Sequence, residues 1–123
     1  MKKIIVVEDE DVLVKALSIE LLGAGFEVMS ALDGEAGLAL IQKEEPDLVL
    51  LDLTMPKLPG FEVLKKLKEE ANTKHIPVVI LSNLGQDEDK KKGLELGAVD
   101  YFVKSSTDLS LLTEKIKKIL EFN

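Results

Sequence analysis

The stretch DLVLLDLTMPKLPGFEVL, residues 47–64, contains a buried strand, an acidic residue at its end and the start of a helix. The apolar run at residues 48–51 does not alternate with polar residues, as expected for a strand of a parallel sheet that helices cover on both faces. Asp52 follows this run, and two prolines stiffen the loop that leads to Gly60 at the start of the next helix. The stretch therefore predicts a strand-loop-helix unit with a carboxylate at the carboxyl end of its strand.

Similar units recur on both sides of this stretch. Apolar, β-branched runs predict five strands, at residues 4–7, 26–31, 48–51, 78–81 and 99–103. Segments with the apolar spacing of helices follow them, for example Leu13, Leu17 and Leu21 after the first strand. Five strands that alternate with five helices predict an α/β sandwich around a parallel sheet.

Length and composition predict one domain. The chain has 123 residues and is 46% hydrophobic, so residues 1–123 are expected to form a single domain without a separate output domain. No run approaches the roughly 18 apolar residues that a membrane-spanning helix needs. The chain has no Cys for disulfides or a thiolate metal site, which fits a reducing compartment. We therefore expect a cytoplasmic protein that does not associate with membranes.

The charge of the chain argues against a nucleic-acid partner. The formal net charge is −7 and the isoelectric point is about 4.8, whereas binding to the phosphate backbone relies on clustered Lys and Arg. Lysines do gather at residues 90–92 and again between residues 115 and 118. Such runs are typical of solvated helix faces, which is how we interpret them.

Polar residues of complementary chemistry stand at the ends of four predicted strands. They are Glu8 and Asp9 after the first strand, Asp52 after the third, Ser82 and Asn83 after the fourth, and Lys104 after the fifth. The ligand crevice of an open parallel sheet lies beyond the carboxyl ends of its strands. If these strands are neighbours, three carboxylates, a hydroxyl and an ammonium meet in one region.

Such a site needs positive charge, because carboxylates packed together repel one another. Oxygen ligands without His or Cys favour Mg²⁺, and Lys104 is the natural second cation. Asp52 is the best candidate for a nucleophile toward phosphorus, since a metal ion and an ammonium can offset charge on the transferring oxygens. The stiff loop after Asp52 can hold a backbone carbonyl toward the metal.

Together with these residues, four stretches make the sequence resemble the receiver domain of bacterial response regulators over essentially its whole length. The stretches are IIVVEDE at residues 4–10, DLVLLDLTMPKLPGFEVL at 47–64, IPVVILSN at 76–83 and GAVDYFVKS at 97–105. The resemblance implies a (βα)5, flavodoxin-like fold, which is a doubly wound sheet of five parallel strands in the order 2-1-3-4-5.

The resemblance also implies a role for each residue of the site. Asp52 would be the phosphoacceptor and, with Asp9 and the backbone carbonyl of Thr54, a direct ligand of Mg²⁺. Glu8 would bind the metal through water, and Lys104 would pair with the phosphoryl oxygens. Phosphoryl acceptance thus depends on residues from three strand ends.

Two further residues would form a switch in a protein of this family. Ser82 would be the hydroxyl that moves to the phosphoryl group, and Tyr101 the aromatic side chain that turns inward after it. The physical reason is that a phosphoryl group adds nearly two negative charges and three hydrogen-bond acceptors. The resemblance places the output face on the fourth helix, the fifth strand and the fifth helix.

The implied function is a phosphoryl-accepting signalling switch of a two-component phosphorelay. Its donor would be a sensor histidine kinase or a phosphotransfer protein, and a downstream protein of unknown identity would read the change. The chain would be a monomer or a weak, phosphorylation-dependent dimer. It would not be an enzyme, although it would assist its own phosphorylation and dephosphorylation.

The sequence departs from the family pattern at several positions of the site. Ser105 stands where the family usually has a proline after a cis bond; without proline a cis bond costs about 2.5–4 kcal/mol, so either the bond stays cis under strain or the loop differs. Asn83 replaces a smaller residue and can restrict access to the acceptor, and Glu8 replaces the commoner Asp. By the same resemblance, Thr54 and Leu84 occupy positions that would tune the lifetime of the phosphoryl group.

Other functions fit the sequence less well. Ser105 and Asn83 motivate one alternative, a phosphorylation-independent interaction module of the same fold. An aspartate-nucleophile phosphatase needs a second acid two positions after its nucleophile, where this chain has Thr54. A flavodoxin-type flavin binder needs an uncharged phosphate loop, but residues 8–11 are all acidic. His75 lies in a polar stretch and is expected to be a surface residue rather than a phosphohistidine.

Overall fold

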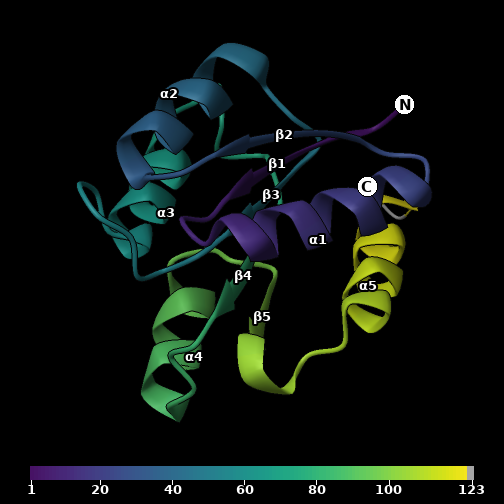
Figure 1. Cartoon of the computed structure of the whole chain (residues 1–123). Coiled ribbons are helices and arrows are strands. Elements are labelled where there is room, and N and C mark those ends of the chain that lie inside the picture. Colours follow the sequence, from purple (N-terminus) through teal and green to yellow (C-terminus); the bar gives the residue numbers. More distant parts are fainter. Residues whose placement is uncertain (122–123) are drawn as a thin grey trace.

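The computed structural model describes residues 1–121, in which five strands alternate with five α-helices (Figure 1). The elements in chain order are β1 (Lys3–Val7), α1 (Asp11–Gly23), β2 (Glu27–Ala31), α2 (Gly34–Glu44), β3 (Leu48–Leu51), α3 (Gly60–Glu69), β4 (Val78–Ser82), α4 (Asp87–Glu95), β5 (Asp100–Val103), the 3-10 helix η1 (Lys104–Ser106) and α5 (Leu109–Glu121). Residues 122–123, the end of the predicted domain, lie outside the described residues.

The strands form one parallel sheet in the order β2-β1-β3-β4-β5. This order confirms the doubly wound fold and places β3 at the centre, between β1 and β4. In the register, Ile4 of β1 faces Val28 of β2 on one side and Leu48 of β3 on the other. The carboxyl ends of all five strands therefore lie at one edge of the sheet.

Two strands begin one residue later than the apolar pattern predicts. β2 starts at Glu27 because the backbone N–H of Phe26 closes the end of α1, where it donates to the carbonyl of Leu21 at 3.1 Å. β5 likewise starts at Asp100. The side chain of Phe26 is nevertheless buried. The apolar pattern indicates which side chains are buried, not which backbone groups pair. It therefore predicted that Phe26 belongs to the strand.

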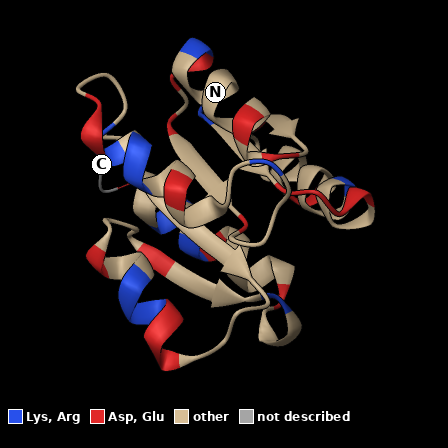
Figure 2. Cartoon of the chain, turned by 90° about the vertical axis from the view of Figure 1, so that its left-hand side faces the viewer, with Lys and Arg blue, Asp and Glu red and all other residues tan. Residues whose placement is uncertain are grey.

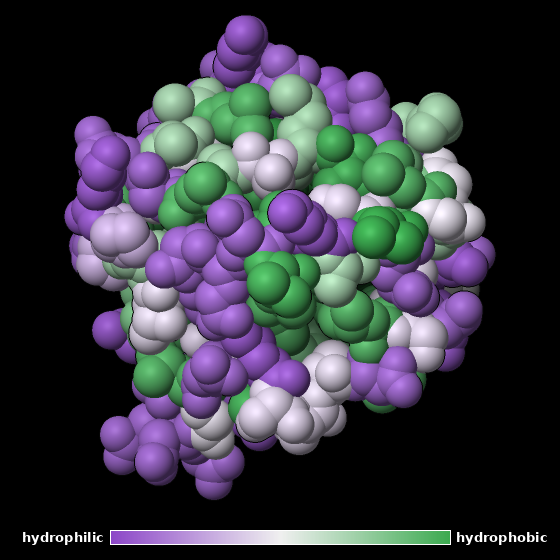
Figure 3. All heavy atoms as spheres, viewed as in Figure 1, coloured by the Kyte–Doolittle hydropathy of each residue, from purple (hydrophilic) through white to green (hydrophobic). Residues whose placement is uncertain are grey.

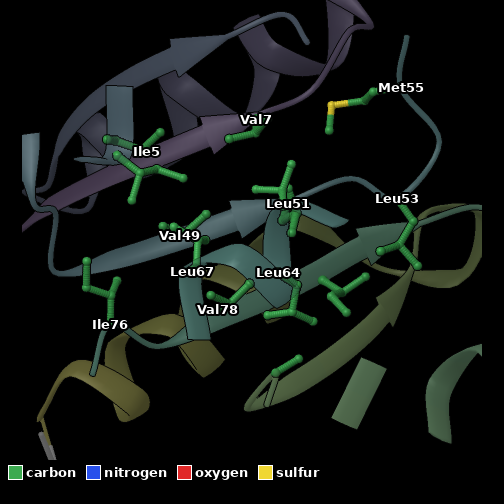
Figure 4. Packing of buried hydrophobic residues seen from close by; sticks show 14 of the residues in the cluster. Ile5, Val7, Val49, Leu51, Leu53, Met55, Leu64, Leu67, Ile76 and Val78 are labelled. Atoms are coloured by element: carbon green, nitrogen blue, oxygen red, sulfur yellow. The ribbon is translucent and has the colours of Figure 1, made fainter. Parts of the chain in front are cut away.

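Helices cover both faces of the sheet, as Figure 1 shows. On one face, the strand residues Ile5, Val7, Val49 and Leu51 pack in one cluster with Ile41 of α2 and with Leu64 and Leu67 of α3 (Figure 4). On the other face, the intervening strand residues Ile4, Val6, Leu48 and Leu50 pack in one cluster with residues of the two helices α1 and α5, namely Leu17, Leu21, Leu112 and Ile116. Because successive side chains of a strand point to opposite faces, both sets must be apolar, which explains the unbroken apolar run of β3.

Helix α4 packs against the same face as α2 and α3, but through few residues. Its buried residue is Gly93, and a Cβ there would lie 2.7 Å from Ile80 Cδ1 and 3.2 Å from Tyr101 Cδ2. The ammonium of Lys92 lies 4.4 Å from the centre of the Phe61 ring on α3. The helix is therefore seated on the sheet by a glycine, directly against the ring of Tyr101.

Charged side chains lie mainly on the helices and loops, and β3 and β4 carry none (Figure 2). The face shown in Figure 3 mixes polar and apolar side chains. Two exposed apolar residues of α1 are Val12 and Ile19. Within residues 1–121, every helix is too short or too polar to cross a membrane.

Candidate functional site

The backbone of the sheet positions the polar residues at the strand ends. The N–H of Glu8 donates to the carbonyl of Ala31 at 3.0 Å, and the N–H of Asp52 donates to the carbonyl of Val7 at 3.0 Å. The ladder of hydrogen bonds therefore continues one residue beyond β1 and β3. This continuation holds Glu8 and Asp52 side by side at the carboxyl edge of the sheet.

Three predicted metal ligands come together at this edge. Carboxylate oxygens of Glu8, Asp9 and Asp52 all lie within 4.8 Å of one another. Glu8 and Asp52 are buried, at 2% exposure each, whereas Asp9 is exposed. One accessible and two buried carboxylates, with no His or Cys among them, form a donor set that suits Mg²⁺.

Lys104 reaches into this cluster from the residue after β5. Its Nζ lies 2.7 Å from Glu8 Oε1, 3.1 Å from Glu10 Oε1 and 3.5 Å from Asp52 Oδ2. The Lys104 side chain is only 9% exposed. The expected second cation is thus present at the site, where it is closest to Glu8.

One oxygen of Asp52 is left without a hydrogen bond. Oδ1 accepts a hydrogen bond from the N–H of Thr54 at 3.4 Å, whereas the buried Oδ2 has no hydrogen-bond partner among residues 1–121. The 3.5 Å contact of Oδ2 with Lys104 is an ion pair too long for a strong hydrogen bond. A carboxylate oxygen without a hydrogen bond is available to bind a metal ion or to act as a nucleophile, so Asp52 fits the site that the sequence predicts.

A glycine allows the loop after Asp52 to fold back onto the strand end. The N–H of Gly60 donates to the carbonyl of Leu53 at 3.0 Å. A Cβ on Gly60 would lie 2.2 Å from the backbone oxygen of Asp52 and 2.6 Å from the Cα of Leu53. Because no side chain fits there, this position requires glycine for the close approach of the two backbones, in addition to its place at the start of α3.

Burial shifts the titration of the site. It raises the pKa of Glu8 to about 7, although the hydrogen bond with Lys104 acts in the opposite direction. It also raises the pKa of Asp52, against the lowering effect of the Lys104 charge. Burial lowers the pKa of Lys104, but its hydrogen bonds with Glu8 and Glu10 and the negative charges of Asp52 and Glu8 together raise this pKa above its ordinary value. The carboxylates therefore lack sufficient positive charge, and a divalent cation would supply it.

The two predicted switch residues meet at the backbone of Leu84. Ser82 is fully buried, and its Oγ accepts a hydrogen bond from the N–H of Leu84 at 3.3 Å. The hydroxyl of Tyr101 donates to the carbonyl of Leu84, and the ring of Tyr101 is buried. Tyr101 thus lies inward, whereas the prediction that its rotamer follows phosphorylation stays a prediction.

The sequence left two alternatives at Ser105, a strained cis bond or a changed loop, and the structure of the loop after β5 distinguishes them. Residues 1–121 contain no cis peptide bond, so the bond between Lys104 and Ser105 is trans. The chain instead forms the short helix η1, and the hydroxyl of Thr107 donates to the carbonyl of Val103 at 2.6 Å. The loop therefore differs from the family pattern, as expected for a bond that lacks proline.

The remaining predicted residues lie at the surface of the molecule. Asn83 and Thr54 are exposed, and Asn83 lines a groove together with Lys104. His75 is exposed before β4, at the opposite edge of the sheet, as expected. Sequence reasoning missed Glu10 as a residue of the site. Its place in the acidic block at residues 8–11 was the one sequence feature that could have indicated it, because its partner Lys104 lies 94 positions away in the chain.

A parallel sheet in this order, with acidic residues and a lysine at its carboxyl edge, defines a doubly wound α/β protein with an acidic cluster at the edge where such folds bind ligands. The family model of the response regulator receiver domain matches residues 4–117. The chain therefore belongs to the response regulator receiver family.

Two curated relatives of this chain are longer than it is. It is 38% identical over 120 residues to the response regulator PleD of Caulobacter vibrioides, covering 98% of this chain and 26% of that protein. It is also 38% identical over 120 residues to the DNA-binding dual master transcriptional regulator RpaA of a Synechocystis strain, covering 98% of this chain and 49% of that protein. The chain thus spans between a quarter and a half of these relatives.

Solved receiver domains share the whole fold. The receiver domain of the Francisella response regulator 1452 matches with a TM-score of 0.92 and 28% identity, over 98% of both chains. The Vibrio cholerae chemotaxis protein CheY4 matches with a TM-score of 0.88 and 30% identity, over 96% of this chain and 98% of that chain. These matches agree with the strand order described above.

Proposed function

We propose that this chain is a cytoplasmic, phosphoryl-accepting switch of a two-component phosphorelay, with Asp52 as the acceptor. The donor would be a sensor histidine kinase or a phosphotransfer protein. The observation that carries the proposal is Asp52 Oδ2, which is buried, has no hydrogen bond within residues 1–121 and lies 3.5 Å from Lys104. Membership of the receiver family supports the same conclusion.

In the proposed transfer, an oxygen of Asp52 bonds to phosphorus while the bond between phosphorus and the donor nitrogen breaks. The electron pair of that bond leaves with the imidazole of the donor. Lys104 offsets negative charge on the phosphoryl oxygens, which it can approach because its Nζ already lies beside Asp52. The chain acts on its own aspartate and does not turn over a separate substrate, so we propose a signalling module rather than an enzyme.

Asp9, Asp52 and the backbone carbonyl of Thr54 would hold Mg²⁺ directly, and Glu8 through water. Carboxylate oxygens of the three acidic residues lie within 4.8 Å of one another, and the oxygen-only donor set fits this ion. When bound, Mg²⁺ supplies positive charge that stabilises the transferring oxygens. The protein contributes the fixed positions of these ligands at the ends of β1 and β3.

The effect of the new charge would be transmitted to the output face by movement of the backbone at Leu84. A phosphoryl group adds three strong acceptors, toward which the Ser82 hydroxyl can move. Ser82 and Tyr101 both hydrogen-bond to Leu84, so movement of this loop changes the surroundings of Tyr101. The ring of Tyr101 contacts α4 at Gly93. We therefore propose that a protein partner reads the change on α4, β5 and α5.

The test is phosphorylation of the purified chain with Mg²⁺ and a small phosphodonor, followed by intact-mass measurement. We expect a gain of one phosphoryl group in the wild type and none in Asp52→Asn. Asp87→Asn, which changes an exposed aspartate at the start of α4, is the matched control and should be labelled normally. Labelling of Asp52→Asn at the wild-type rate would refute the assignment of the acceptor.

A phosphorylation-independent module of the same fold is the second candidate. It is favoured by the exposed Asn83 at the rim of the site and by the changed loop at Ser105. Capture of partners from a cell extract, with and without a phosphodonor, separates the two candidates. Equal recovery of the same partner in both states would favour the second.

A further inference from the structure

Glu10 pairs with Lys104 at the edge of the proposed site, although it is not one of the three clustered carboxylates. Lys104 Nζ lies closer to Glu8 Oε1, at 2.7 Å, and to Glu10 Oε1, at 3.1 Å, than to Asp52 Oδ2, at 3.5 Å. In the proposed function Glu8 faces the metal. Glu10 is then the carboxylate that competes with Asp52 and the phosphoryl group for Lys104.

Among residues 1–121, Lys104 is the partner of the Glu10 carboxylate. Glu10 is the N-cap residue of α1, with φ −87° and ψ 104°, and its side chain caps none of the helical N–H groups. Short polar residues are preferred at this position because they accept a hydrogen bond from the first turn, which a glutamate here does not do. The backbone is held instead by the N–H of Glu10, which donates to Glu8 Oε2 at 3.1 Å. The carboxylate is thereby free to reach Lys104.

Glu10 and Lys104 both line one groove. The groove has a volume of about 340 Å³, and its lining residues are Glu10, Val12, Leu13, Ala16, Asn83, Lys104 and Ser105. The Glu10 side chain is 56% exposed, whereas that of Lys104 is 9% exposed. Solvent and small solutes therefore meet the carboxylate of Glu10 before they reach the ammonium.

We infer that Glu10 is a positioning residue that restrains Lys104 and slows phosphorylation of Asp52 by small anionic donors, an inference that rests on the proposed function. With acetyl phosphate, an oxygen of Asp52 bonds to phosphorus, the bond from phosphorus to the acetyl oxygen breaks, and acetate leaves with the electron pair. Lys104 must exchange Glu10 for the phosphoryl oxygens during this step. The carboxylate of Glu10 also repels the incoming anion.

The test compares initial rates of phosphorylation by acetyl phosphate in the wild type and in Glu10→Gln, by intact-mass measurement. Mg²⁺ is kept saturating for each protein, as determined by calorimetry. We expect Glu10→Gln to react about two- to fivefold faster, a size typical of a partly exposed ion pair. The ratio should fall toward one in about 0.5 M salt, because salt screens exposed charges. A purely structural role for Glu10 would not produce this salt dependence.

Glu114→Gln is the matched control, because Glu114 is an exposed glutamate paired with a lysine, Lys117, on α5. It makes the same change in net charge and should react at the wild-type rate. A Glu10→Gln rate equal to or below that of the wild type, or a ratio unaffected by salt, would overturn the inference. Absence of labelling in the wild type would instead refute the proposed function, so the two failures are distinguishable.

Discussion

Glu8 and Asp52 are each only 2% exposed, and within residues 1–121 their ion-pair partner is Lys104. A buried carboxylate favours its neutral form unless enough positive charge surrounds it. The raised pKa values of Glu8 and Asp52 show that one ammonium does not suffice. When no metal is present, the buried carboxylates of Glu8 and Asp52 therefore destabilise the fold at neutral pH.

This balance predicts how the stability of the metal-free protein depends on pH. The pKa of Glu8 is about 7 in the folded chain, against an ordinary value of 4.5. An acid with a raised folded pKa stabilises the fold below its unfolded pKa, and this contribution is lost as the pH rises through the folded pKa. In EDTA, we expect the free energy of unfolding by urea to fall by on the order of 3 kcal/mol between pH 4.5 and 8.

Glu8→Gln is the control for this prediction, because the amide has a similar shape and does not titrate. We expect the variant to lose most of the decline in stability between these pH values. A wild-type protein that is equally stable at both ends of the range, or a Glu8→Gln variant with the full decline, would contradict the assignment to Glu8.

At the scale of elements, α4 buries the fewest residues of the α-helices described within residues 1–121. Gly93 is its buried residue, whereas α1, α2, α3 and α5 each bury three or more. Three lysines and four acidic residues within its nine positions leave the rest of the helix polar. The place of α4 on the sheet therefore depends on the close contact of Gly93 with Ile80 and Tyr101.

Gly93→Val tests this contact. A side chain at Gly93 would overlap Ile80 and the ring of Tyr101, so we expect a loss of about 1–3 kcal/mol in the free energy of unfolding beyond that of a control. Gly23→Val is the matched control, since a Cβ at Gly23 meets nothing within 4 Å. Tyr101 is the only Tyr in a chain without Trp, so its fluorescence should also change. Equal stability of the two variants would show that α4 is not seated through Gly93.

At the scale of the whole molecule, the proposed cation at the carboxyl edge would join β1 to β3. A ligand that binds only the folded state stabilises the protein by an amount that depends on its concentration relative to the dissociation constant. At pH 8, we expect Mg²⁺ at 100 times this constant to raise the free energy of unfolding by about 2.7 kcal/mol. Asp9→Asn should weaken this stabilisation, and Asp47→Asn, distant from the cluster, should not. Equal stabilisation of all three proteins would place the cation elsewhere.

Much of the fold could be predicted from the sequence because the relevant signals are local. Apolar runs report which segments are buried, and β3 has the predicted bounds. The strand order is a property of the whole sheet; it came from the resemblance to a family, and the structure confirms it. The boundaries at Phe26 and Asp100 could not be read from apolarity, because they depend on backbone hydrogen bonds.

The sequence by itself determined the parts of this site: acids after β1 and β3, a hydroxyl at the end of β4 and a lysine after β5. Only the tertiary structure decided the contacts of these residues, such as the ion pair of Glu10 with Lys104 and the hydrogen bond from Tyr101 to Leu84. It also decided that the peptide bond between Lys104 and Ser105 is trans. The physical reason is the separation along the chain of the residues that interact. Burial and turn chemistry act between near neighbours in the chain, whereas an ion pair across 94 positions forms where the packed sheet happens to bring two charges together.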